Sequence, residues 1–99
     1  QSTGIAAQAA QKARSLVASV RSTQEEMKHD HELIHEAEKR AELGKNYLAM
    51  TLDEYNRGVK NSPDVLGATE KYLFYLKRYA ELKHHYQISR VSLLAITGQ

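Results

Sequence analysis

Histidines are the residues of this chain whose type and spacing could do chemistry. His31 and His35 are four residues apart in a predicted helix, so they share one face at a spacing compatible with metal binding. Two antiparallel helices would bring His84 and His85 close to His35, which makes a zinc site across the pair one hypothesis. The chain has no cysteine, and the neighbouring glutamates are ordinary helix residues. Solvated or half-buried histidines are the preferred interpretation, and we expect no metal and no cofactor.

Other function classes are disfavoured by composition and motifs. The sequence offers no set of nucleophile, base and acid and no phosphate-binding loop, so we expect no enzyme. The net charge is +2 with both signs mixed, and no basic stripe points to nucleic acid. No apolar run approaches the roughly 20 residues of a membrane-spanning helix. The chain begins at Gln1 without a signal peptide, so we expect a mature or excised fragment.

Small and apolar residues recur at alternating intervals of three and four through the first half of the chain. Only Asp30 interrupts this pattern outright, and the spacing is typical of a helix that packs as a coiled coil. We predict a helix over about residues 5–57, roughly 80 Å long at 1.5 Å per residue. The positions are Ala6, Ala9, Ala13, Leu16, Val20, Thr23, Met27, Asp30, Ile34, Ala37, Ala41, Gly44, Leu48, Thr51 and Tyr55.

The same spacing returns in the second half and predicts a helix over about residues 63–97. Ser62 is the expected cap, with Pro63 at the first helical position and Gly98 after the end. The turn is expected at residues 58–62, so the fold class is all-α: one antiparallel two-helix coiled-coil hairpin over residues 1–99. The second set of positions is Val65, Ala68, Tyr72, Tyr75, Tyr79, Leu82, Tyr86, Ser89, Leu93 and Ile96. Together, the two sets of positions are called the seam.

Folding the chain about this turn predicts which seam residues meet. Gly44 should face Tyr75, where a small residue accommodates a large one, and Asp30 should face Ser89 as a polar pair. Each helix also carries a second apolar stripe, which a lone hairpin cannot cover. A closed ring of helices would cover it, because each helix then packs against two neighbours. The second stripe comprises Ala10, Val17, Met27, Ile34, Leu48 and Leu52, followed by Leu66, Leu73, Leu76, Ala80 and Leu94.

The residues around the turn resemble the periplasmic hairpin of the TolC family of outer membrane channels. The resemblance rests on Tyr55, Gly58, the run Asp64-Val65-Leu66, Ala68, Tyr86 and Gly98, and the spacing is most similar to the second of the family's two repeats. It implies a periplasmic tunnel segment of a trimeric outer membrane channel for efflux or type I secretion. Its partners would be a membrane-fusion adaptor and the other hairpins of the helical barrel, and membrane contact would come only from other parts of the parent protein.

The resemblance also implies roles for individual tip residues. Arg57, Gly58, Val59 and Lys60 occupy the adaptor-docking tip, whereas Tyr55, Lys60 and Asp64 match residues that restrain the periplasmic gate. Lysine at position 60 keeps the charge of the family's arginine without its bidentate fork. Gly67 stands where the family has a second aspartate, which weakens any acidic ring.

Two alternative functions remain open from the sequence. One is a stand-alone coiled-coil interaction hairpin, including the adaptor side of the same machine. Adaptor hairpins carry an Arg-Leu-Ser tip pattern that this turn lacks, which favours the channel side. The other is a metal-binding helical protein, which rests on the histidines alone.

Overall fold

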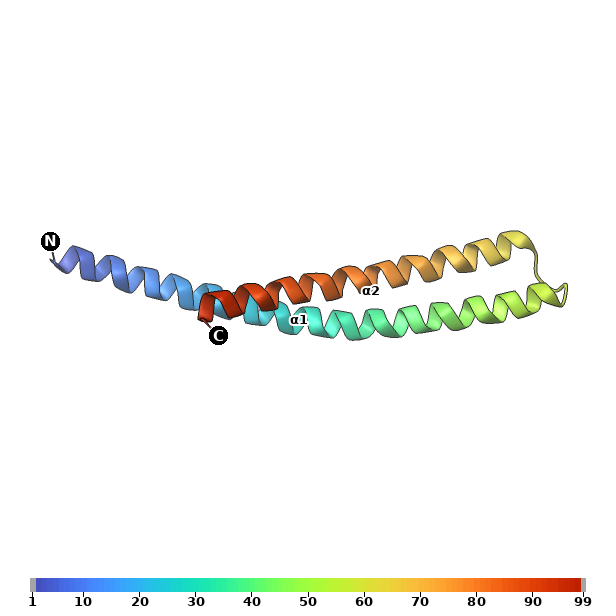
Figure 1. Ribbon diagram of the computed structural model, residues 1–99, viewed down its shortest axis with the longest axis horizontal. Helices are drawn as coiled ribbons and strands as arrows, with labels where there is room; N and C mark the ends of the chain where they lie inside the picture. Colours follow the sequence, from blue (N-terminus) through green and yellow to red (C-terminus); the bar gives the residue numbers. More distant parts are fainter. Residues whose placement is uncertain (1, 99) are drawn as a thin grey trace.

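Two long helices joined by a short turn make up the fold. The structure is a computed structural model that describes residues 2–98, with the side chains described from residue 4 onward. Helix α1 spans Ser2–Asn56 and helix α2 spans Ser62–Thr97. The helices run antiparallel in a rod of 83 × 21 × 16 Å (Figure 1). The described residues contain no strand, so the all-α hairpin is confirmed.

The predicted seam is where the two helices bury their side chains. In α1, every seam position from Val20 to Thr51 is buried or half-buried, and in α2 the same holds from Val65 to Leu93. The deepest positions lie in the half nearest the turn, where Thr51 and Ala68 are each only 2% exposed. The three-four spacing therefore identified the packed faces correctly, because it matches the helical period closely enough to keep one stripe towards the partner.

The seam is shorter than the sequence pattern suggested. Because α2 ends at Thr97, the first part of α1 extends beyond it without a partner helix (Figure 1). Every described residue from Gly4 to Ser19 is exposed, including the seam residue Leu16. At the other end of the seam, Tyr55 is also exposed.

The register differs from the predicted one by about one helical turn. Gly44 lies against Tyr72, whose Cα would be 3.3 Å from a Cβ added at Gly44, rather than directly against Tyr75. Likewise, Asp30 bonds to His85 and not to Ser89. When one helix slides along the other by three or four residues, each seam residue takes the place of its neighbour in the seam. The same positions are then buried, but each faces a different residue of the partner helix.

A second set of apolar residues faces outward. Leu52, Leu66, Leu73, Leu76 and Leu94 are exposed, whereas Met27, Ile34 and Leu48, which also belong to the seam, are half-buried. The hairpin therefore leaves only part of the second stripe uncovered. Among the described residues, neither helix contains a stretch apolar enough to cross a membrane.

Candidate functional site

The C-terminal end of α1 is closed by Gly58, which allows the chain to reverse. Gly58 has φ +79°, a left-handed conformation that residues with a Cβ adopt at a cost. Its N–H donates to the carbonyl of Tyr55 at 3.0 Å, and the N–H of Val59 donates to the carbonyl of Glu54 at 2.9 Å. This pair of hydrogen bonds is the Schellman arrangement, which satisfies carbonyls that the helix leaves free.

The N-terminal end of α2 is capped by Asn61, so the prediction of Ser62 as the cap was wrong. The Asn61 side chain accepts from the N–H of Asp64 at 3.2 Å, and the Asp64 carboxylate accepts from the N–H of Asn61 at 3.1 Å. This reciprocal pair is a capping box, with Pro63 in the first turn. Asn61 is the cap because its backbone is extended, at φ −109° and ψ 174°, which places its side-chain oxygen over the first turn of α2. Ser62 is already part of the helix.

The two basic tip residues are held by acidic residues of the last turn of α1. Arg57 pairs with Asp53 at 2.8 Å, and the Lys60 Nζ lies 4.0 Å from a carboxylate oxygen of Glu54. Negative charge at a helix C-terminus is unfavourable, and α1 has no basic residue in its last turn. The turn supplies the compensating cations. The Arg57–Asp53 pair is exposed, and such pairs contribute at most about 1 kcal/mol.

The candidate docking and gate residues therefore gather at one end of the rod. Val59 is 68% exposed and Tyr55 is 43% exposed, so both present apolar surface beside the turn. Asp64 is engaged in the capping box, and Lys60 reaches Glu54. No hydrogen bond or ion pair among the described residues joins Tyr55, Lys60 and Asp64 to one another. Within this hairpin, the gate candidates share a location but do not form a cluster.

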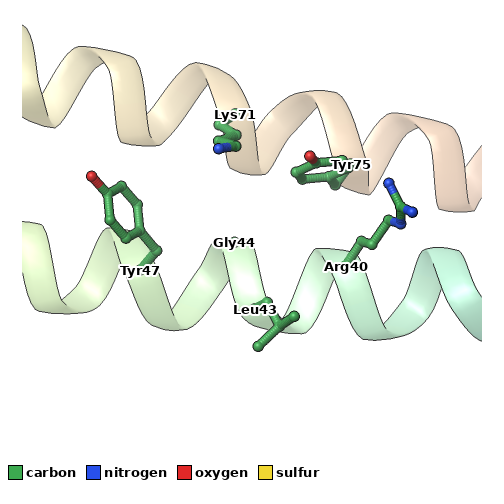
Figure 2. A pocket seen from close by; sticks show the side chains of 6 residues that line it. All are labelled: Arg40, Leu43, Gly44, Tyr47, Lys71 and Tyr75. Atoms are coloured by element: carbon green, nitrogen blue, oxygen red, sulfur yellow. The ribbon is translucent and has the colours of Figure 1, made fainter.

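Gly44 lines a groove between the helices (Figure 2). The groove has a volume of about 340 Å³. Its lining residues are Arg40, Leu43, Gly44, Tyr47, Lys71 and Tyr75. The rings of Tyr47 and Tyr75 lie between the helices on either side of Lys71, while Leu43 points away from α2 (Figure 2). An open groove on a rod cannot surround a small ligand, and its shape suits packing against another helix.

A polar cluster crosses the hairpin at Asp30. The Asp30 carboxylate, in a residue only 6% exposed, lies 2.8 Å from His85 Nδ1, and His85 Nε2 lies 3.4 Å from Glu26. Sequence reasoning missed this contact because it paired Asp30 with Ser89. The available signal was the polar residue in an otherwise apolar seam, since a buried carboxylate requires a hydrogen-bonding partner.

The histidines of the zinc hypothesis are arranged differently from what was expected. His31 lies beside Tyr86, with ring centroids 6.1 Å apart. Within the part of the chain that the structure describes, Glu26, Asp30 and His85 form the group of three possible metal ligands. His35 and His84, which the hypothesis placed near one another, are not members of this group.

Comparisons with known proteins leave the family of this chain unassigned. No protein-family model matches it, and neither a curated protein nor a solved structure matches it significantly.

Proposed function

We propose that this chain is a periplasmic tunnel hairpin of a TolC-like trimeric outer membrane channel for efflux or type I secretion. In this proposal, the hairpin packs side by side with others in a helical barrel in the periplasm. Its tip binds the hairpin of a membrane-fusion adaptor and contributes to the gate. The proposal rests on the resemblance of the turn residues together with the surface of the hairpin.

The observation that carries the proposal is the second apolar stripe. Leu66, Leu73 and Leu94 on α2 and Leu52 on α1 are exposed, outside the stretch of seam that the hairpin buries. Contiguous exposed apolar surface marks interaction sites. A ring of hairpins covers it, because each helix then has a neighbour on both sides.

The tip supports adaptor docking through its rigidity and exposure. The Schellman arrangement at Gly58 and the capping box at Asn61 hold the turn with main-chain and short side-chain hydrogen bonds. Because the turn is already ordered, a partner that binds Val59 loses little affinity to the conformational entropy of the loop. The cations of Arg57 and Lys60 are held only by exposed or long ion pairs, so a partner that offers carboxylates can replace those pairs.

Single cysteines test the docking assignment, because the chain has none of its own. Val59→Cys places a thiol at the tip, and Ile5→Cys places one at the far end with nearly equal exposure, 68% against 70%. In the complete channel, together with its adaptor, we expect a homobifunctional thiol cross-linker to join Val59→Cys to a cysteine at the adaptor tip. The Ile5→Cys variant should give no such product.

The same experiment separates the proposal from a stand-alone interaction hairpin. If Val59→Cys joins only to a second copy of this chain, the tip is a self-association site and the docking assignment fails. Equal adaptor cross-linking from Ile5→Cys and Val59→Cys would show that the contact is not specific to the tip. Export measured with both variants checks that the channel remains assembled.

A further inference from the structure

Three metal-ligating side chains come together across the hairpin, far from the tip. Glu26 and Asp30 lie four residues apart on one face of α1, and His85 reaches them from α2. One ligand atom from each residue lies within 4.8 Å of the other two. Unlike a cluster of surface acids, this group includes an imidazole and a carboxylate buried in the seam.

The distances suit a small metal ion with tetrahedral coordination. Zinc ligands of the nitrogen and oxygen type lie about 2.0–2.2 Å from the metal, which places neighbouring ligands roughly 3.3–3.5 Å apart. His85 Nε2 and the Glu26 carboxylate oxygen are 3.4 Å apart. Because the side chains of Glu26 and His85 are each about half exposed, both can adjust and water can complete the coordination.

Asp30 prepares His85 for metal binding. When Nδ1 carries the proton, it donates to the Asp30 carboxylate at 2.8 Å, and Nε2 then directs its lone pair towards Glu26. Metal-bound histidines commonly donate their other ring N–H to a carboxylate in this way. The Asp30 carboxylate also has acceptor capacity beyond this one bond.

We propose that Glu26 and His85 bind a divalent transition-metal ion of the zinc class, which links α1 to α2, while Asp30 holds the imidazole in place through its Nδ1–H. An imidazole with carboxylates suits zinc, nickel or copper, whereas magnesium and calcium prefer oxygen ligands alone. The ion joins Glu26 of α1 to His85 of α2, at the end of the hairpin away from the turn. Binding therefore opposes separation of the two helices where the turn cannot hold them.

Zinc titration of the full chain tests the proposal, with calorimetry for affinity and circular dichroism for the melting temperature. We expect zinc chloride to bind with one ion per chain and to raise the melting temperature, and magnesium chloride to do neither. His85→Gln should weaken zinc binding at least about tenfold. The matched control is His84→Gln, which removes the neighbouring histidine outside the cluster and should retain both the affinity and the thermal shift.

A second variant keeps the test valid if His85→Gln disturbs the fold. Glu26→Gln changes an exposed side chain that the seam does not need, and it too should weaken zinc binding at least about tenfold. Unchanged affinity in either cluster variant, or an equal loss in His84→Gln, places bound zinc elsewhere and overturns the assignment. Absence of zinc binding by the unaltered chain overturns it as well.

Discussion

Replacing Gly44 by Ala measures how closely the two helices approach. A Cβ at this position would lie 3.3 Å from the Cα of Tyr72 and 3.6 Å from its Cβ. The nearer atom belongs to the main chain of α2, so it cannot rotate away as the end of a flexible side chain can. The helices must instead move apart by a few tenths of an ångström. Such a shift loosens the seam contacts on both sides of Gly44.

Two opposing terms set the magnitude. Alanine is favoured over glycine inside a helix by about 1 kcal/mol. Inserting atoms into a closely packed interface costs roughly 1–3 kcal/mol. We therefore expect Gly44→Ala to leave the free energy of unfolding unchanged or to lower it by up to about 2 kcal/mol. Gly44→Leu, which adds more volume, should lower it by roughly 1–3 kcal/mol despite the better helix propensity of leucine.

Gly67 supplies the control, because it is an exposed helical glycine with nothing within 4 Å of an added Cβ. Gly67→Ala should raise the free energy of unfolding by about 1 kcal/mol, since only the propensity term acts. The measurement is urea unfolding followed by circular dichroism. If Gly44→Ala stabilises the chain as much as Gly67→Ala does, the helices separate at no cost, and the close approach at Gly44 is refuted.

Three further predictions concern the tip. Gly58→Val should reduce adaptor-dependent export in the complete channel, whereas Gly58→Asn should retain most of it, because asparagine tolerates a left-handed backbone. Equal export by both variants would show that adaptor docking does not depend on the left-handed conformation at residue 58. Asn61→Ala should lower the free energy of unfolding by about 1 kcal/mol and Ser62→Ala by much less, measured by urea unfolding, and the reverse order would place the cap at Ser62. The double substitution Tyr55→Phe with Lys60→Ser should raise the conductance of the reconstituted channel in planar bilayers. The exposed contacts proposed for these residues are weak and favour the closed state of the gate, so removing them should favour the open state. Unchanged conductance would remove the gate assignment.

The candidate site could be predicted from sequence in its location but not in its contacts. Gly58 and Pro63 between two seams place the turn, because a left-handed residue and a residue without an N–H interrupt helices wherever they fold. The hydrogen-bonding partners of the tip side chains could not be predicted from the sequence. Asn61, Ser62 and Asp64 are all good residues for a helix start, and the backbone angles at the turn decide which of them caps.

The sequence by itself determined the fold class and the buried faces of both helices. The three-four spacing from Val20 to Thr51 and from Val65 to Leu93 is a local property of the chain, and it specifies a stripe whatever lies opposite. Only the tertiary structure decided the register. A periodic seam is nearly unchanged by a slip of one turn, so the path of the chain through the tip selects the pairs. That choice placed Tyr72 against Gly44 and brought His85 to the buried carboxylate of Asp30.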